Sequence, residues 1–264
     1  MRREPAPTAP FIRIAGVGKR FGCREEPTQA LQGVSLDIPR NSFVSLVGHS
    51  GCGKSTLLRI VSGLESASEG EVAIDGLSPR AYGRDRPMGF VFQESALMPW
   101  KSVLDNVRLP LDVLGVGMPA EREARACAFI ELVRLAGFEH HFPPQLSGGM
   151  RQRASIARSL AYAPEVLLLD EPFGALDDFT RREMGDELLR IWAERQCTVL
   201  FVTHSLSEAV LLSDQVVVLA PRPGRIQQVL PIDLPRPRDA GVRRSPRFAA
   251  YVAQLETMIF GGRA

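Results

Sequence analysis

The sequence is poor in lysine and has no closely spaced pair of cysteines. Its lysines are Lys19, Lys54 and Lys101, so arginine supplies nearly all of the positive charge. The four cysteines are scattered without a CxxC pair, which argues against a zinc site or a disulfide framework. No run of about 18 apolar residues occurs, so we expect no helix that crosses a membrane. The first ten residues lack the apolar segment of a secretory signal.

Charge of either sign is also not in excess. The formal net charge is +2 over 264 residues, so the composition gives no reason to expect a nucleic-acid partner. Hydrophobic residues make up 45% of the chain, which is typical of a globular protein with a sizeable core. Against this background Lys54 stands out, because a lysine is kept where arginine serves nearly everywhere else.

Short apolar strands and helical stretches alternate along the chain and predict an α/β fold. A helical insert from about residue 100 to 160 interrupts the strand-rich core. Strands are expected at 11–21, 31–39, 42–48, 70–76, 88–93, 165–172 and 197–204, with a terminal hairpin at 216–226. Helices are expected at 102–115, at 121–137, after Gly149 and at 180–194.

Composition divides the chain into three stretches. Residues 1–10 are rich in proline and are expected to be disordered. Residues 11–232 form the main domain, in which a helical subdomain of about 94–160 is inserted. Residues 233–264 form a tail rich in arginine and proline that is partly helical. The simpler expectation for this tail is a helix that packs on the core, and the alternative is a contact with a membrane surface or partner.

Residues 48–56, GHSGCGKST, match the phosphate-loop pattern GxxxxGK[ST] between a predicted strand and a predicted helix. Backbone amides in such a loop form an anion-binding nest at the start of the helix. Lys54 can bridge β- and γ-phosphates, and the Ser55 hydroxyl can bind Mg²⁺. We interpret Cys52 as a packing residue. The alternative, a glycine turn around a buried lysine, does not account for the strand–loop–helix context.

A second glycine-rich helix start lies at residues 146–153, LSGGMRQR. Ser147 is predicted to be the N-cap, because its hydroxyl can accept a hydrogen bond from a backbone amide that has no partner within the helix. Gly148 and Gly149 leave the backbone accessible, so an anion can approach the amides. The chain therefore contains two candidate phosphate-binding helix starts, and one bound nucleotide does not explain both.

Two carboxylates follow the apolar strand in EVLLLDEP, residues 165–172. Because ligands bind at the carboxyl ends of strands in such sheets, Asp170 is predicted to reach Mg²⁺, directly or through water. Glu171 could polarise an attacking water. In isolation, a capped strand end with solvated acids is an equal alternative, and it becomes minor beside a phosphate loop.

Three further polar residues follow predicted strands. Gln93 ends the strand in FVFQES and could ligate Mg²⁺ or orient water, although a surface glutamine is a strong alternative. His204 ends VLFVTH and could contact the γ-phosphate or hold the water, although a histidine at a strand end is more often structural. Asp177 in GALD is by itself only a loop aspartate.

The ordered set GHSGCGKST, VFQES, LSGGMRQR, VLLLDEPFGALD and VTH resembles the ATP-binding subunit of an ABC transporter. The resemblance covers roughly residues 11–232, and five motifs in one order are far more specific than any single motif. The phrases MPWKSVLDNV, SEAVLLSDQVVVLAPRPGRI and LPRPR resemble one branch, the import ATPases of the nitrate, sulfonate and taurine class.

This resemblance implies a P-loop NTPase core of the ABC ATPase type, with an antiparallel β-subdomain and an inserted α-helical subdomain. It also implies that two subunits stand head to tail around ATP. The phosphate loop of one copy would hold the phosphates from one side, and the serine–glycine helix start of the other copy would close the site. The second anion site would therefore serve the partner's ATP, and ATP would hold the dimer together until hydrolysis.

The resemblance also assigns roles by position in this sequence. It gives Glu171 the role of general base, Gln93 that of the sensor after its strand, and His204 that of the switch histidine. It places Ser55, Gln93 and Asp170 at Mg²⁺. ATP contacts would come from Phe21, Gly48, His49, Ser50, Gly51, Cys52, Gly53, Lys54, Ser55 and Thr56, from Asp177 at the dimer seam, and in trans from Leu146, Ser147, Gly148 and Gly149. Phe21 would stack on adenine.

The sequence departs from the family pattern at two positions. Met150 stands where many relatives have glutamine, and activity should survive, because Ser147 and the glycines make the nucleotide contacts. Asn41 stands where relatives usually have glycine before the strand that leads to the phosphate loop. Asparagine tolerates a positive φ better than most residues, so the turn should persist.

The expected partners are a second copy of the chain, transmembrane permease subunits and, indirectly, a periplasmic or lipid-anchored solute-binding protein. Met98, Pro99 and Trp100 are predicted to line the groove that receives a permease helix. Packing of Trp100 inside the helical lobe is an equal alternative. These partners place the chain peripherally on the cytoplasmic face of the bacterial inner membrane.

Other functions fit the motifs less well. A soluble ABC ATPase acting on DNA or ribosomes usually carries coiled coils, zinc sites or paired nucleotide domains, and the sequence shows none. An ordinary P-loop kinase has no use for a second anion site in trans. A non-enzymatic role is improbable, because Glu171 and His204 are both present. The solute stays open among nitrate, alkanesulfonate, taurine, bicarbonate and a thiamin or pyrimidine precursor.

Overall fold

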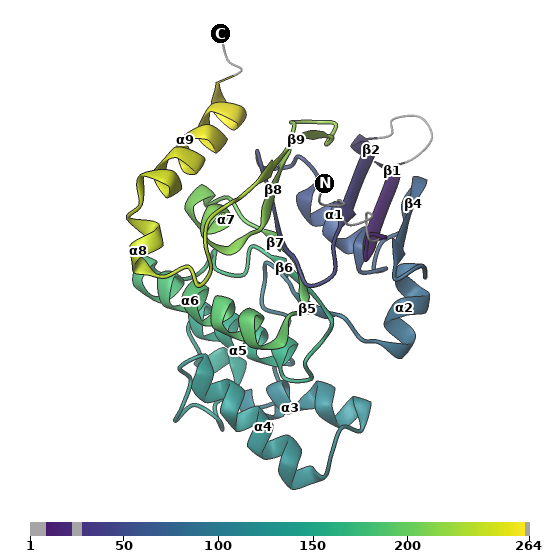
Figure 1. Cartoon of the computed structure of the whole chain (residues 1–264). Helices are drawn as coiled ribbons and strands as arrows, with labels where there is room; N and C mark the ends of the chain where they lie inside the picture. The colour runs from purple at the N-terminus through teal and green to yellow at the C-terminus, as the bar shows by residue number, and fades with distance from the viewer. Residues whose placement is uncertain (1–8, 23–27, 262–264) are drawn as a thin grey trace, which may run out of the picture. The chain divides into compact units, whose positions relative to one another are not determined.

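The computed structural model describes residues 9–22 and 28–261, so most of the proline-rich segment 1–10 lies outside the described residues. The chain divides into two compact units. The first unit consists of residues 1–87 and 197–264, and the second consists of residues 88–196. Figure 1 follows the elements of both units along the chain.

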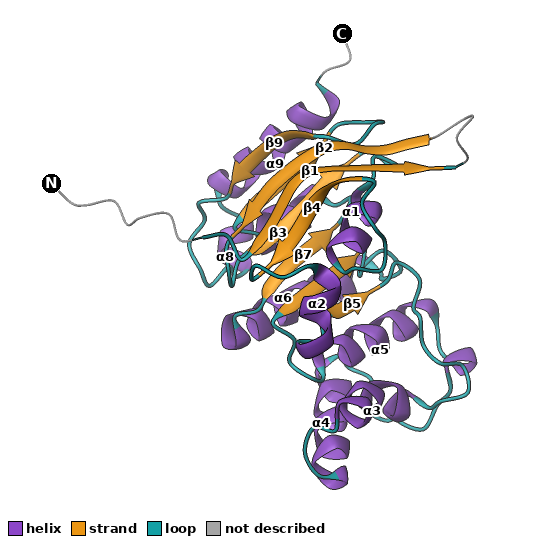
Figure 2. Ribbon diagram, turned by 90° about the vertical axis from the view of Figure 1, so that its right-hand side faces the viewer, coloured by secondary structure: helices purple, strands orange, loops and turns teal. Residues whose placement is uncertain are grey.

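A three-stranded antiparallel sheet forms the first layer of the first unit. It contains β1 (Ile12–Phe21), β2 (Thr28–Ile38) and β4 (Glu69–Ile74) in the order β2-β1-β4, as Figure 2 shows. Ile12 pairs with Ile38 on one side and with Ile74 on the other. The buried positions Ile12 and Ile14 show the alternation of a strand with one face in the core, and a register shift between Ile14 and Val17 brings Val17 to a buried position as well. The predicted strands at 11–21, 31–39 and 70–76 are confirmed.

A second sheet of the first unit carries the predicted loop motifs. Its parallel strands are β7 (Thr198–Val202), β3 (Phe43–Gly48) and β8 (Gln215–Leu219), in that order. β9 (Ile226–Pro231) pairs antiparallel with β8, which confirms the predicted hairpin. β3 and β7 are buried along nearly their whole length, as expected of parallel strands covered on both faces.

Helices of the first unit follow these strands. α1 (Lys54–Val61) follows β3, and α7 (Leu206–Leu212) follows β7. α2 (Pro79–Asp85) follows β4. The predicted turn before β3 is present, because Asn41 has a φ of 60°. The short helices α2 and α7 were not predicted, since seven residues give too few repeats of the helical period.

The arginine-rich tail packs against the core of the first unit. It contains α8 (Ala240–Arg243) and α9 (Pro246–Phe260). Leu255 of α9 is fully buried in a cluster that also holds Val216 and Val218 of β8. The buried Arg238 donates hydrogen bonds to five backbone carbonyls around the end of α7 and the segment after β9. A packing helix, the simpler expectation for the tail, is therefore confirmed.

The second unit is mostly helical. It contains α3 (Val103–Leu114), α4 (Pro119–Leu132), the 3₁₀ turn η1 (Pro143–Gln145), α5 (Gly148–Leu160) and α6 (Asp178–Arg195). Two parallel strands, β5 (Gly89–Val91) and β6 (Val166–Asp170), complete it. α3, α4 and α5 pack on one another (Figure 1), as the predicted helical insert requires. Among the described residues, no helix combines the length and apolar character needed to cross a membrane.

Candidate functional site

The phosphate-loop motif joins β3 to α1 in the first unit. β3 ends at Gly48, and α1 begins at Lys54 with Gly53 as its N-cap. The N-cap Gly53 makes no side-chain hydrogen bond to the helix, and among the described residues the first turn of α1 carries no acidic residue. The first amides of a helix have no partner within the helix, and the helix dipole favours negative charge there. The start of α1 is therefore suited to a phosphate group.

Close packing fixes the identity of Gly53. Its φ is 94°, a left-handed conformation that residues with a side chain adopt rarely. A Cβ atom at this position would lie 2.5 Å from Leu31 Cδ2 and 2.9 Å from the Ala30 carbonyl oxygen of β2. The loop can follow this path only with glycine here, so β2 and the loop form one packed unit.

Lys54 folds back over the loop. Its Nζ donates hydrogen bonds to the carbonyl oxygens of Gly48 at 2.8 Å and His49 at 3.1 Å. The side chain is only 6% exposed. Cys52 is buried beside it, with its Sγ 3.8 Å from Lys54 Nζ, which agrees with a packing role for the thiol. The ammonium group thus lies against the loop that the motif assigns to phosphates.

His204 follows the strand next to the phosphate-loop strand. Leu46 of β3 pairs with Val202 of β7, so both strands bring their carboxyl ends to the same edge of the sheet. Thr203, beside His204, donates a hydrogen bond to Glu208 Oε2 at 2.6 Å and accepts one from the Ser205 amide at 3.0 Å. These bonds fix the turn that presents the exposed His204. Thr203 and Glu208 were not among the predicted site residues.

Phe21, the predicted adenine contact, ends β1. Its side chain is 41% exposed, so it is not a core residue. Lys19 Nζ lies 4.9 Å from the centre of its ring, and the same ammonium forms an ion pair with Glu65. The aromatic side chain therefore lies at the surface of the unit, as a residue that stacks on a ligand requires. The Lys19 ammonium over its ring is a cation–π contact.

In the second unit, the predicted metal and water-activating residues gather at the ends of β5 and β6. Val91 pairs with Leu169, so Gln93 and Asp170 both lie at the carboxyl ends of neighbouring parallel strands. Asp170 is buried. Gln93 Nε2 donates a hydrogen bond to Glu171 Oε2 at 3.5 Å. The structure therefore brings Gln93 and Glu171 together, although 78 positions separate them in sequence.

The backbone of Glu171 is left-handed, with a φ of 47°. Such a conformation is uncommon for a residue with a long side chain and costs free energy. A hydrogen bond from the Gly174 amide to the Glu171 carbonyl, at 3.1 Å, closes the turn. Backbone strain of this kind is concentrated at functional sites, which supports the interpretation of Glu171 as a reacting group.

The second helix start, α5, differs from the first. Ser147 is its N-cap, and its hydroxyl accepts a hydrogen bond from the Met150 amide at 3.3 Å, which confirms the predicted cap. Ser147 and Gly148 are exposed, whereas Leu146 is buried. Among the described residues, a Cβ on Gly148 would meet only the Arg151 guanidinium within 4 Å, at 3.9 Å. The serine and the first glycine are thus open to a large partner.

Asp177 is the N-cap of α6. Its carboxylate accepts hydrogen bonds from the Thr180 amide at 2.9 Å and from the Thr180 hydroxyl at 2.7 Å. These bonds, the backbone one first, hold the pKa of Asp177 below its usual value. The predicted loop aspartate therefore carries a charge and starts a helix, and its side chain is exposed.

Two residues of α5 that were not among the predicted site residues hold the segment that carries Gln93. Gln152 Nε2 donates to the Phe92 carbonyl at 3.1 Å, and Arg158 donates to the Ala96 carbonyl at 2.7 Å. Burial of Arg158 lowers its pKa. Gln152 is buried in α5, and a buried polar side chain needs a hydrogen-bond partner, but nothing in the sequence identifies that partner.

The predicted docking segment is exposed at its tip. Trp100 is 71% exposed, so the alternative in which it packs inside the helical lobe is wrong. The buried Asn106 holds the segment in place. Its Nδ2 donates hydrogen bonds to the carbonyls of Met98 and Lys101, and its Oδ1 accepts one from the Met98 amide. The loop is thus rigidly built, with an aromatic side chain facing outward.

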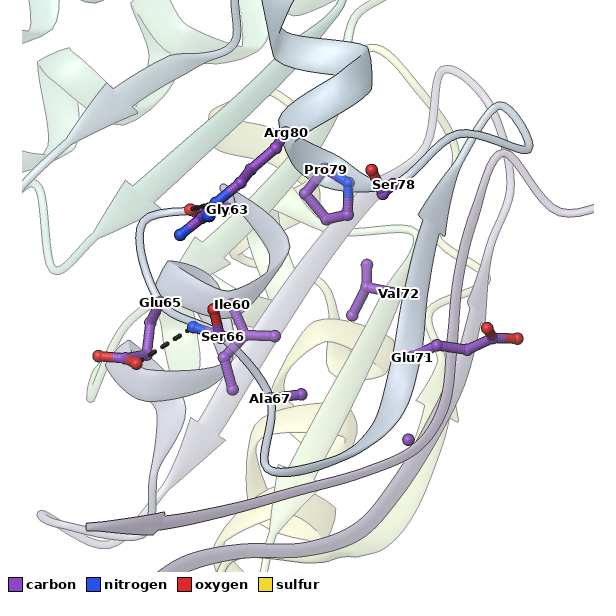
Figure 3. A pocket seen from close by; sticks show the side chains of 11 residues that line it. Ile60, Gly63, Glu65, Ser66, Ala67, Glu71, Val72, Ser78, Pro79 and Arg80 are labelled. Atoms are coloured by element: carbon purple, nitrogen blue, oxygen red, sulfur yellow. Dashed lines mark hydrogen bonds between the residues drawn. The ribbon is translucent and has the colours of Figure 1, made fainter. Parts of the chain in front are cut away.

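Among the described residues, no group of three potential metal ligands gathers. A pocket of about 270 Å³ lies elsewhere in the first unit, between the end of α1 and the start of α2 (Figure 3). Its walls include Ile60, Val72 and Arg80. In the part of the chain that the structure describes, none of the predicted site residues lines it, so it is separate from the phosphate loop.

Comparisons with known proteins agree on one family. The family model described as "ABC transporter" matches residues 31–174. An aliphatic sulfonates import ATP-binding protein, SsuB of Bacillus licheniformis, is 44% identical over 87% of this chain and 87% of its own length. The taurine import ATP-binding protein TauB of Rhizobium johnstonii is 46% identical over 87% of this chain and 88% of its own length.

Another relative and a solved structure extend the match. An uncharacterised ABC transporter ATP-binding protein of Methanocaldococcus jannaschii is 48% identical over 91% of this chain and 88% of its own length. A solved dimeric ATP-binding cassette, in a post-hydrolysis state with ADP and phosphate, superposes with a TM-score of 0.78 at 35% identity. That match covers 84% of this chain and 98% of the cassette.

Proposed function

This chain belongs to the ABC transporter family as an ATP-binding and ATP-hydrolysing subunit, and from that premise we propose that it powers the import of a small solute. The solute class is that of nitrate, sulfonates and taurine. The names of the sulfonate and taurine import relatives support this class. The subunit acts peripherally, on the cytoplasmic face of the bacterial inner membrane, together with permease subunits that form the path.

The start of α1 carries this proposal. Its amides have no side-chain cap in the described part of the chain, and Lys54 lies across the same loop. In our proposal residues 48–56 surround the β- and γ-phosphates, and Lys54 leaves its carbonyl partners to bind them. Phe21 stacks on the adenine ring, and His204 contacts the γ-phosphate from the neighbouring strand end.

The residue types also fit Mg²⁺. This ion prefers oxygen ligands and retains several waters, so it is usually held by one or two protein groups together with the substrate phosphates. The Ser55 hydroxyl, the Gln93 amide oxygen and the buried Asp170 carboxylate supply such oxygens. Mg²⁺ neutralises charge on the phosphates.

Glu171 is proposed as the general base. Its carboxylate accepts a hydrogen bond from Gln93, and its backbone has a left-handed conformation. In this role Glu171 takes a proton from the attacking water, and Gln93 orients the carboxylate and senses the γ-phosphate. The Glu171→Gln variant should therefore bind ATP but release phosphate at roughly one hundredth of the normal rate or less.

A second copy of the chain completes each site in our proposal. Ser147, Gly148 and Gly149 of one copy close over ATP held by the other, and Asp177 lies at the seam. The exposure of Ser147 and Gly148 supports this arrangement, because an anion can reach the amides of α5 from outside. The solved dimeric cassette with ADP and phosphate supports it independently.

The permease subunits are proposed to dock at Met98, Pro99 and Trp100. The exposed Trp100 side chain supports this, since an exposed tryptophan on a rigid loop suits an interface. A solute-binding protein takes part indirectly, by delivering the solute to the permease. Nucleic acid is not a partner in this proposal, in keeping with the nearly balanced charge.

The test is a reconstituted transporter that carries the Trp100→Ala variant. Solute uptake into vesicles should fall strongly, while ATP hydrolysis by the isolated subunit should stay at the wild-type level. The matched control is Val113→Ala on α3, because Val113 is 75% exposed and should affect neither uptake nor hydrolysis. Loss of both activities in Trp100→Ala would contradict the docking proposal. Hydrolysis by a chain that never associates with membranes, even with its permease present, would favour a soluble ATPase.

A further inference from the structure

The last turn of the C-terminal helix touches the phosphate loop. His49 Nε2 donates a hydrogen bond to the Ile259 carbonyl at 3.2 Å. The rings of His49 and Phe260 meet edge to face, with their centres 5.7 Å apart and an angle of 80° between the planes. This is a favourable geometry for an aromatic pair. Both residues belong to the first unit, and 210 positions separate His49 from Ile259.

The same helix packs against the strand that leads into the loop. Leu255 of α9 is buried in one apolar cluster with Val47, the residue directly before Gly48. Met258 and Ile259 pack against this cluster from the last turn of α9. The helix therefore contacts the loop motif at two points, through the core below Gly48 and through the side chain of His49.

The carbonyl groups at the end of α9 explain why this contact is specific. The last four carbonyls of a helix have no partner within the helix and need donors from elsewhere. His49 supplies a donor to Ile259, and Gln227 of β9 donates to the Met258 carbonyl at 3.1 Å. The phosphate loop thus caps the helix, and the helix in return holds the side chain of His49.

The same helix also supports the element that follows His204. α9 packs against α7, which begins two residues after His204 (Figure 1). Leu206, in the first turn of α7, packs against the cluster that holds Leu255. One helix therefore supports both the phosphate loop and the helix behind His204.

We infer that α9 braces the phosphate loop through His49, and that docking of its last turn raises the affinity of the loop for ATP. His49 is a positioning residue in this account, because its side chain acts through the loop backbone. A loop that is already held in its binding conformation loses less conformational freedom when the ligand arrives. This inference rests on the proposed assignment of residues 48–56 to the ATP phosphates.

The first test is an equilibrium titration with Mg-ATP in the Glu171→Gln background, where hydrolysis does not interfere. His49→Ala and Phe260→Ala should each raise the dissociation constant about three- to tenfold, the scale of one aromatic contact. Phe260→Tyr, which keeps the ring, should restore wild-type affinity. The matched control is Leu64→Ala, since Leu64 and Phe260 are both 59% exposed and Leu64 follows the other end of α1.

The double variant His49→Ala with Phe260→Ala separates a direct contact from general weakening. If both residues act through one contact, the dissociation constant of the double variant should not exceed that of the single variant that binds ATP more weakly. Independent, additive losses would overturn the inference, and so would unchanged or tighter binding in both single variants. Because Phe260 is largely exposed, its variant should fold even if His49→Ala does not.

Amide exchange supplies the reciprocal test. If the docked turn favours ATP binding, ATP must stabilise the docked turn by the same factor. Exchange at residues 255–261 should slow when Mg-ATP is added, and the change should vanish in His49→Ala. The Lys54→Ala variant distinguishes failure of the proposed function from failure of the proposed brace. A wild-type chain that does not bind ATP would refute the proposed function, whereas ATP binding that depends on Lys54 but not on α9 would refute only the brace.

Discussion

The helices α1 and α5 both begin at a serine- and glycine-rich motif, but their starts are built in opposite ways. α1 has a glycine N-cap in a left-handed conformation, close packing against β2 and a buried lysine. α5 has a serine N-cap that hydrogen-bonds its own helix, and its first residues are exposed. The first start is enclosed by its own unit, and the second is open to the surroundings.

This difference between an enclosed and an exposed helix start determines what each of them can bind. An enclosed loop with a lysine can hold phosphates without help from another molecule. An open start offers a few amides and one hydroxyl, which is too little to surround a phosphate group alone. We therefore assign the first start to ATP held in cis and the second to ATP held by another copy. Substitutions at either helix start test this contrast.

Removal of the lysine should have the largest effect. Lys54→Ala takes away the cation that lies over the loop, and we expect ATP turnover to fall roughly 100- to 1000-fold. Phosphate release at saturating Mg-ATP measures this. Lys101→Ala is the control, because it removes the same charge outside the loop and should leave turnover unchanged. Normal turnover in Lys54→Ala would contradict the assignment of the enclosed start.

Substitution of the open helix start should abolish hydrolysis but spare ATP binding by the single subunit. Ser147→Arg places a long cation where the second copy's ATP is expected, so turnover should fall roughly 100-fold. Ser78→Arg provides the control, since Ser78 is the exposed N-cap of α2 and loses a comparable cap. Equal losses in both variants would mean that helix capping, and not a contact in trans, explains the effect.

The two glycines of α5 should separate stability from activity. Gly148→Ala adds a methyl group to open space, so the free energy of unfolding should rise by about 0.5 kcal/mol through helix propensity. Its ATP turnover should nevertheless fall about tenfold, because the methyl group enters the contact in trans.

Gly149→Ala is expected to behave differently from Gly148→Ala. Its methyl group would meet Leu176 Cδ2 at 3.2 Å and the Ala175 carbonyl oxygen at 3.4 Å, so unfolding should become easier by about 1 kcal/mol. Denaturant titration together with turnover measures both variants. A Gly148→Ala variant with full activity would show that nothing closes over this residue.

The smallest effect is expected at Met150. Ser147 caps α5 by accepting a hydrogen bond from the backbone amide of Met150, and Met150→Gln keeps that amide. Turnover of Met150→Gln should therefore stay within about twofold of the wild type, well below the loss of a transition-state contact. A tenfold change in either direction would show that the side chain itself contacts the nucleotide or the second copy.

Much of the fold was predictable because its signals are local. The apolar runs of β3, β6 and β7, the hairpin of β8 and β9, and the cap at Ser147 all follow from short patterns. The predicted ABC ATPase fold is confirmed by the solved cassettes that superpose on this chain. Pro110 lies inside α3 and does not end it, since the helix continues to Leu114. Here packing of α3 on α4 and α5 outweighs the cost of proline.

Parts of the candidate site depend on contacts between distant residues and could not be predicted. The left-handed backbone of Glu171 has no signal in its residue type. The bond from Arg158 to Ala96 joins residues 62 positions apart, and that from His49 to Ile259 joins residues 210 apart. Sequence patterns identify which residues carry the chemistry, whereas tertiary packing decides how each one is held.

ATP-dependent dimerisation of the Glu171→Gln variant is the most direct test of whether the start of α5 contacts ATP held by a second copy. Light scattering with and without Mg-ATP measures the mass of the particle while hydrolysis is blocked. We predict a monomer without ATP, a dimer with ATP, and a return to monomer when Ser147→Arg is added to the same chain. A Glu171→Gln chain that binds ATP and dimerises equally well with Ser147→Arg would contradict the assignment of the open helix start to the partner's ATP.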